Sequence, residues 1–309
     1  MRPVYFGTSK FAVAVLRRLA TSSHRPVLVV TPPDRPRGRG RKLAPPPVAA
    51  AARELGIELH QTERVSDERL VERIRAGAAG VGVVCAFGQL IREPLLSELE
   101  MLNVHPSLIA RWRGAAPIER AIMAGDAETG VTIMRVGAGL DSGPVALTER
   151  TPIERAEDYG ALSARLAELG GELIVRALDL RASGELELTE QDDSLATYAE
   201  KIAPSERRLD PARPAVELER TVRALNPHIG AYLALDGGER LGVRAAAAQD
   251  GALPPGRLAA DGRALRLGCG EGVLRLDVVQ PAGKRPMEAE AYLRGHPVPQ
   301  LSAELERGK

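Results

Sequence analysis

The chain has 309 residues, of which 44% are hydrophobic and 27% charged, and its formal net charge is +1. This composition is typical of a globular protein, argues against a disordered chain, and leaves room for two domains. No apolar run approaches the ~20 residues of a membrane helix, and no signal peptide follows Met1. We therefore expect a cytoplasmic protein without a membrane anchor. Any nucleic-acid contact must come from a local basic patch.

Cysteine and histidine positions give no sign of a disulfide or a metal site. Cys85 and Cys269 are isolated and far apart in the sequence, and the five histidines lack metal-ligand spacing. We expect two reduced thiols and no metal.

The first part of the chain alternates strand-like and helical patterns. It opens with an apolar run at 4–6, a turn at Gly7 and an amphipathic run from 11 to 19. Further strand-like runs lie at 26–30, 81–85, 101–104 and 131–136. This alternation predicts an α/β fold with a Rossmann-like, mostly parallel doubly wound sheet. The first turn lacks G-x-G-x-x-G, which disfavours an NAD-dependent enzyme.

The pattern changes after a helix predicted from 158 to 182. A polar stretch follows, then one helical pattern at 215–225 and short strands separated by Gly- and Pro-containing turns. We predict a small OB-like β-barrel. The expected divisions are a catalytic domain at 1–188, a linker at 189–206 and a second domain at 207–309.

Polar side chains follow a predicted strand at Asn103 and His105. Residues two apart in a strand face the same side, and Pro106 ends the strand by removing a backbone donor. Ligands of parallel α/β sheets bind at the carboxyl ends of strands. We therefore expect Asn103 and His105 to converge on a ligand at this rim.

A glycine-rich run around Asp141 could return a carboxylate to the same rim. Taken singly, Asn-x-His is often only a strand end, and Asp-Ser-Gly is a common turn in which the Asp caps its own backbone. Asn103, His105 and Asp141 together are our candidate catalytic set.

The segment from 103 to 145, NVHPSLIARWRGAAPIERAIMAGDAETGVTIMRVGAGLDSGPV, resembles the methionyl-tRNA formyltransferase family. The resemblance continues through FGTSKFA, PDRPRGRGRKLAPPPV, VVCAFGQLI, TYAEKI and QPAGKRPM, and so covers nearly the whole chain. The Asn, His and Asp of the family match Asn103, His105 and Asp141. Departures from the family pattern occur at Ala110, Pro211 and His228, and they bear on tRNA affinity more than on chemistry.

This resemblance implies formyl transfer from 10-formyltetrahydrofolate, a co-substrate rather than a tightly bound cofactor, to methionyl-initiator tRNA. It implies a Rossmann-like donor-binding domain and a β-barrel that assists tRNA binding, and we expect a monomer. The implied donor-binding residues are Ala86, Phe87, Gly88, Ser107, Leu108, Gly139 and Leu140.

A run of basic residues lies after the second predicted strand. It is interleaved with Pro36, Gly38 and Gly40, cannot form a stable helix, and by composition alone could be a solvated loop. Such a loop can also follow phosphates, and the corresponding family loop engages the tRNA acceptor arm. The implied tRNA-binding residues, with Arg39 foremost, are Arg35, Arg37, Arg39, Arg41 and Lys42.

Formyl transfer to an amine passes through an oxyanion, for which Asn103 and His105 could donate hydrogen bonds while Asp141 relays a proton. Three alternatives remain open. They are a formyltransferase for an amino-sugar nucleotide, a formyltetrahydrofolate hydrolase or dehydrogenase module, and a noncatalytic RNA-binding protein.

Overall fold

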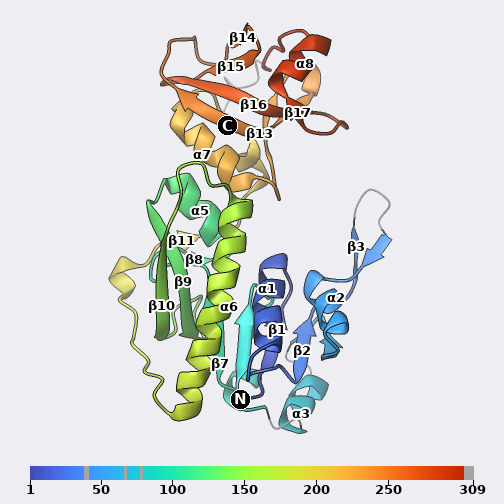
Figure 1. The fold of residues 1–309 in the computed structure, drawn as a ribbon, viewed down its shortest axis with the longest axis vertical. Helices are drawn as coiled ribbons and strands as arrows, with labels where there is room; N and C mark the ends of the chain where they lie inside the picture. Colours follow the sequence, from blue (N-terminus) through green and yellow to red (C-terminus); the bar gives the residue numbers. More distant parts are fainter. Residues whose placement is uncertain (38–41, 66–67, 77–78, 303–309) are drawn as a thin grey trace. The chain divides into compact units, whose positions relative to one another are not determined.

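The computed structural model describes the chain except residues 38–41, 66–67, 77–78 and 303–309. It divides into two compact units (Figure 1). The first unit contains residues 1–117, 128–152 and 163–199, and the second contains residues 118–127, 153–162 and 200–309.

The first unit is built on a seven-stranded sheet in the order β10-β9-β7-β6-β1-β2-β5. The pairs β7–β6, β6–β1, β1–β2 and β2–β5 are parallel, whereas β9 and β10 extend one edge of the sheet through antiparallel pairing. The Rossmann-like prediction is therefore confirmed. The strands are β1 (Val4–Gly7), β2 (Leu28–Thr31), β5 (Glu58–Gln61), β6 (Gly82–Cys85), β7 (Met101–His105), β9 (Glu128–Arg135) and β10 (Val145–Pro152).

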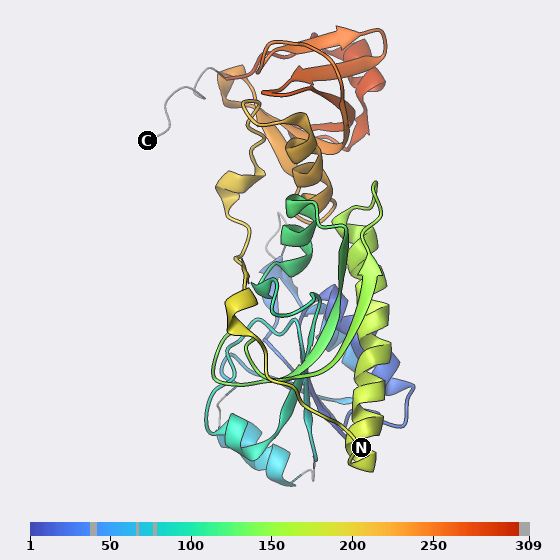
Figure 2. The same ribbon diagram turned by 90° about the vertical axis from the view of Figure 1, so that its left-hand side faces the viewer.

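Helices cover both faces of this sheet, as Figure 2 shows. On one face lie α1 (Lys10–Ala20), α2 (Pro47–Glu54) and α6 (Tyr159–Ser183); on the other lie α3 (Glu68–Ala76) and α4 (Leu95–Glu98). Gly170 of α6 sits so close to Val104 that a Cβ atom there would lie 2.8 Å from its side chain. Helix α6 therefore packs directly on strand β7, which carries the candidate site.

The central strands β1 and β2 are almost entirely apolar because both of their faces are covered. Every residue of β1 and β2 is buried, which is the pattern of a parallel strand between two helical layers. The side chain of Ser9 begins α1 by accepting a hydrogen bond from the N–H of Ala12 at 3.3 Å.

The order of the strands reverses at β1. The chain proceeds outward on one side through β2 and β5, then returns to the other side through β6 and β7. Such a switch point leaves a crevice at the carboxyl ends of the adjacent strands. Strands β6 and β7 are parallel neighbours beside this point, so the residues that follow them lie at the same edge of the sheet.

Shorter elements complete the first unit. The antiparallel pair β3 (Arg35–Arg37) and β4 (Lys42–Ala44) follows β2, and β8 (Arg113–Gly114) pairs in parallel with β11 (Tyr198–Ala199). Thr189 also forms an antiparallel bridge with Val145. The first part of the segment predicted as a linker is thus hydrogen-bonded to the first unit. Helix α5 (Pro117–Ala124) begins at the end of the first range of this unit.

The second unit contains an antiparallel sheet in the order β12-β13-β16-β15-β14, with β17 paired to β16. Its apolar side chains pack with Leu218, Val222 and Leu225 of α7 in one buried cluster. The prediction of a second, turn-rich β domain is confirmed. The elements are α7 (Ala215–Leu225), β12 (Ala231–Ala234), β13 (Arg240–Gln249), β14 (Leu258–Asp261), β15 (Ala264–Gly268), β16 (Val273–Pro281), β17 (Met287–Glu288) and α8 (Ala289–Gly295).

None of the helices in the described ranges has the length and apolar character needed to cross a membrane.

Candidate active site

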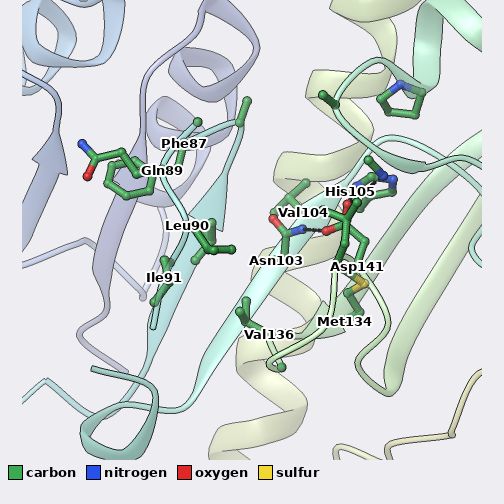
Figure 3. A pocket seen from close by; sticks show the side chains of 18 of the residues that line it. Phe87, Gln89, Leu90, Ile91, Asn103, Val104, His105, Met134, Val136 and Asp141 are labelled. Atoms are coloured by element: carbon green, nitrogen blue, oxygen red, sulfur yellow. Dashed lines mark hydrogen bonds and ion pairs between the residues drawn. The ribbon is translucent and has the colours of Figure 1, made fainter. Parts of the chain in front are cut away.

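A cavity of about 430 Å³ lies at the carboxyl ends of β6 and β7 in the first unit. Its wall combines the segments after β6 and β7 with the glycine-rich loop after β9 (Figure 3). A concave, largely apolar pocket with a few convergent polar groups is the usual form of a small-molecule site. The lining residues are Val84, 86–91, 103–106, Gly114, Ala115, Pro117, Met134, Val136, Gly137 and 139–141.

His105 ends strand β7 with its side chain only 5% exposed. Its Nε2 atom lies 2.9 Å from the carbonyl oxygen of Trp112, so Nε2 carries a hydrogen and donates it. In the neutral ring, Nδ1 is then the unprotonated nitrogen. The Trp112 carbonyl therefore orients the ring and leaves Nδ1 toward the site.

Asp141 receives polar groups from three directions. Its Oδ1 accepts a 3.3 Å hydrogen bond from Asn103 Nδ2, and its Oδ2 accepts one of 2.9 Å from the backbone N–H of Gly114. Oδ2 also lies 3.6 Å from Nδ1 of His105. Figure 3 shows Asn103 and Asp141 pointing toward one another. The structure thus brings Asn103, His105 and Asp141 together at one cavity.

Backbone strain is concentrated at this site. Among the described residues, the non-glycine residues with positive φ are Ala86 (44°), Trp112 (64°) and Asp141 (46°). Ala86 and Asp141 line the cavity, and Trp112 holds His105. Left-handed conformations at such residues cost about 1–3 kcal/mol each and cluster at functional sites.

The residues predicted for donor binding fall into two groups. Ala86, Phe87, Gly88, Gly139 and Leu140 line the cavity, whereas the described residues Ser107 and Leu108 are not part of its lining. The Ser107 hydroxyl instead donates 2.8 Å to the carbonyl of Arg111. Ser107 therefore stabilises the loop behind the site.

Two backbone groups that hold the site were not predicted from the sequence. The Trp112 carbonyl orients His105, and the Gly114 N–H binds Asp141. Gly114 has a φ of 121°, and a Cβ atom there would lie 2.8 Å from the Ala199 carbonyl oxygen. The sequence held one indication of this contact: Arg113 and Gly114 lie within the segment that carries the family resemblance.

The predicted basic loop is a short hairpin at its base, not a simple coil. Arg35 pairs with Ala44, and Arg37 pairs with Lys42, in antiparallel register. Arg35 and Lys42 are exposed. Arg39 and Arg41 lie outside the described residues.

His228, a departure from the family pattern, is engaged within the second unit. Its ring stacks on Tyr159 with centroids 3.6 Å apart, and its Nε2 atom lies 2.9 Å from Glu119 Oε1. Within the described ranges, no group of His, Cys, Asp or Glu side chains has an arrangement that could hold a metal ion.

Comparison with known proteins agrees with the geometry. The formyl transferase family matches residues 1–178, and the formyl transferase C-terminal domain matches residues 201–297. The chain is 44% identical to a methionyl-tRNA formyltransferase of Methylobacillus flagellatus, covering 96% of this chain and 97% of that protein. It is 46% identical to the enzyme of that name from Halorhodospira halophila, covering 95% and 96%.

Solved structures share the fold at low identity. An N-formyltransferase from Helicobacter canadensis, in complex with folinic acid and dTDP-3-aminofucose, gives a TM-score of 0.65 at 14% identity, covering 89% of this chain and 98% of that one. HypX from Aquifex aeolicus, in complex with tetrahydrofolic acid, gives 0.63 at 17% identity over 99% of this chain. The chain spans 48% of the length of HypX.

Proposed function

This chain belongs to the formyl transferase family, and on that premise we propose that it transfers the formyl group of 10-formyltetrahydrofolate to the amino group of methionyl-initiator tRNA. One observation carries the proposal. Asn103, His105 and Asp141 meet at the cavity of a chain that is 44% identical over nearly its full length to a methionyl-tRNA formyltransferase.

The proposed reaction is a direct attack of the amine on the formyl carbon. A C–N bond forms to the methionyl nitrogen, the bond from the formyl carbon to N10 of the folate breaks, and tetrahydrofolate leaves. An α-amine has a reference pKa of about 7.7–8.0, so part of it is neutral at physiological pH. No covalent enzyme intermediate is required.

Asn103 and His105 would stabilise the oxyanion of the tetrahedral intermediate. The amide nitrogen of Asn103 has two hydrogens, and only one is directed at Asp141. The other can donate to the developing O⁻. His105 can add a second donor from Nδ1 when the ring is protonated, since Nε2 is held by Trp112. Donors fixed in advance in this way are the largest single contribution to many acyl-transfer reactions.

Asp141 would move the proton that the amine loses. Its carboxylate lies within the cavity wall and is 17% exposed, so a bound amine can reach it. The proton leaves the attacking nitrogen and is delivered to N10 of the departing folate. Oδ2 of Asp141 lies 3.6 Å from Nδ1 of His105, so both groups can take part in this proton transfer.

The donor would lie against the segments after β6 and β9. We propose Ala86, Phe87, Gly88, Gly139 and Leu140 as its contacts because they line the cavity, and we leave out Ser107 and Leu108. The largely apolar wall of this cavity is suited to a flat aromatic ring such as a pterin. We infer that 10-formyltetrahydrofolate acts as a co-substrate.

The tRNA would contact the basic hairpin β3–β4 and the second domain. Five positive charges within residues 35–42 can neutralise phosphates, and we propose Arg35, Arg37, Arg39, Arg41 and Lys42 for this role. In the proposed division, residues 1–188 perform chemistry, 189–206 link, and 207–309 bind tRNA. We further propose a monomer that acts in the cytoplasm.

A panel of acceptors tests the proposal. The enzyme is incubated with labelled 10-formyltetrahydrofolate and methionyl-initiator tRNA, uncharged tRNA, a dTDP-amino sugar, or no acceptor. We expect label only on the charged tRNA. Label on the sugar, or formate released without acceptor, would identify one of the alternative activities instead.

A further inference from the structure

Residues 189–199, which connect α6 to the second unit, run along the back of the candidate site. Thr189 exchanges two backbone hydrogen bonds with Val145, at 2.8 and 2.9 Å. Further on, the N–H of Arg113 donates 2.9 Å to the carbonyl of Thr197, and β11 pairs with β8. This 189–199 segment is therefore fixed at both ends to elements that support the site.

Gln191 uses both ends of its side-chain amide within this segment. Its Nε2 donates to the backbone carbonyl of Asp141 at 3.0 Å and to that of Gly143 at 2.6 Å. Its Oε1 accepts from Nε and Nη2 of Arg113, at 3.0 and 2.6 Å. One side chain thus joins the loop of Asp141 to strand β8.

Arg113 is the buried anchor of this arrangement. Its side chain is 4% exposed, and its charge is met by Gln191 and by Asp193 at 2.7 Å. The next residue, Gly114, donates its N–H to Asp141 Oδ2. Both the backbone and the carboxylate of Asp141 are therefore held from adjacent positions of β8.

The conformation of Asp141 requires such support. Its φ of 46° is unfavourable for a residue with a Cβ atom, and the surrounding contacts must maintain it. The carbonyl groups at Asp141 and Gly143 receive their side-chain donor from Gln191. Without that donor, the loop loses two of the hydrogen bonds that fix its path beside His105.

We propose that Gln191 is a positioning residue for formyl transfer, which holds Asp141 in reacting geometry through the Asp141 and Gly143 carbonyls. The inference rests on the proposed function. Gln191 lies outside the cavity lining, and we expect it to affect turnover and not substrate binding. A purely structural role, in which Gln191 serves only to satisfy the buried Arg113, is the competing explanation.

Two substitutions at this position separate the explanations. Gln191→Glu keeps an acceptor for Arg113 but removes the N–H donors to the loop. Gln191→Met removes donors and acceptor without adding charge. Asp193→Asn is the matched control, because it keeps an oxygen for Arg113 at a side chain that is 81% exposed and makes no contact with the loop among the described hydrogen bonds.

The readouts are kcat, KM for each substrate, thermal midpoint, and amide hydrogen exchange of residues 137–143. We expect both Gln191 variants to lose about tenfold to a hundredfold in kcat, as small misplacements of a reacting group do. Both KM values should remain near wild type. The 137–143 loop should exchange faster in both variants, and Gln191→Glu should melt near the wild-type temperature.

A normal kcat for Gln191→Glu would overturn the inference. An equal loss of kcat in Asp193→Asn would also overturn it, because the effect would then come from the unbalanced charge of Arg113. Failure of the proposed function is recognised separately. Wild-type enzyme would then form no formyl-methionyl-tRNA, while hydrogen exchange would still report whether Gln191 orders the loop. Unchanged exchange in both Gln191 variants would also contradict the proposal.

Discussion

Nδ1 of His105 lies 3.6 Å from Oδ2 of Asp141, which is longer than a hydrogen bond but within the distance of an ion pair when the ring is protonated. Because Nε2 already donates to the Trp112 carbonyl, the neutral ring presents an unprotonated Nδ1 to the carboxylate. In the proposed reaction, a proton taken from the amine would reside on one of these two atoms. In the proposed mechanism, the pair would accept this proton during the reaction and release it afterwards.

Replacing His105 by Ala should lower kcat by about a hundredfold to a thousandfold, the usual effect of losing one oxyanion donor. The fold should persist because the ring fills a site at the rim of β7 and not the centre of the core. Single-turnover kinetics and a thermal melt measure both effects. His296→Ala, which alters a histidine of the second unit, serves as the control and should keep the wild-type rate.

Asn103→Ala should lower kcat by a comparable factor of about 10²–10³, since its amide donates to Asp141 and is placed to meet the oxyanion. Asn103→Asp keeps the shape but places a second carboxylate beside Asp141, and it should be no more active than the Ala variant. Wild-type turnover in either variant would remove Asn103 from the mechanism.

Gly114→Ala should impair both stability and turnover. A Cβ atom at φ 121° would meet the Ala199 carbonyl at 2.8 Å, and the backbone N–H that binds Asp141 would move. Gly262→Ala is a suitable control because that glycine also has positive φ but nothing lies within 4 Å. It should cost about 1–2 kcal/mol of unfolding free energy with normal kcat. Urea unfolding and steady-state kinetics compare the two; equal effects would argue against the contact with Asp141.

Burial raises the pKa of the Cys85 thiol to about 12, from a usual value of 9.0. Only the thiolate reacts, so at about pH 8 the folded protein should modify far more slowly at Cys85 than the unfolded chain does. The folded state binds the Cys85 proton more tightly than the unfolded chain does, and this difference adds to the free energy of unfolding. The contribution is fully present below pH 9.0 and is lost as pH rises toward about 12. Mass spectrometry after treatment with a thiol reagent, with and without denaturant, checks this. Rapid labelling of native Cys85 would show that the strand opens.

Affinity for methionyl-initiator tRNA should fall steeply as salt concentration rises. The slope of log affinity against log salt concentration should become shallower by about 0.7–0.9 for each phosphate contact removed. Arg39→Ala should weaken binding and reduce this slope, whereas Arg39→Lys, which keeps the charge, should retain most of the affinity. Fluorescence binding titrations at several salt concentrations provide the test. An unchanged slope for Arg39→Ala would exclude the basic run as a phosphate-binding element.

Local patterns were enough to predict five of the seven strands of the sheet and two of the polar side chains at its rim. Strands β5 and β10 were not predicted, because these edge strands are polar and largely unburied and no apolar run marks them. The apolar runs at β1, β2, β6 and β7 coincide with buried strands, because parallel strands covered on both faces must be apolar. Strand alternation likewise predicted that Asn103 and His105 face the same side.

Contacts that depend on distant backbone groups could not be predicted in this way. The Trp112 carbonyl reaches His105 because the loop after β7 turns back, and Gln191 reaches Asp141 across 50 residues of sequence. Neither residue type indicates such a role on its own. A polar stretch such as 189–199 has the composition of a linker, and only its pairing with β8 shows that it is part of the first unit.

The most direct measurement is single-turnover formyl transfer from labelled 10-formyltetrahydrofolate to methionyl-initiator tRNA by wild-type enzyme and by Asp141→Asn, which matches the carboxylate in size. We predict that label passes to the tRNA in the wild type without a labelled enzyme species, and that Asp141→Asn slows transfer by at least about a hundredfold. Wild-type transfer by Asp141→Asn, or label trapped on the protein, would contradict direct transfer at this site.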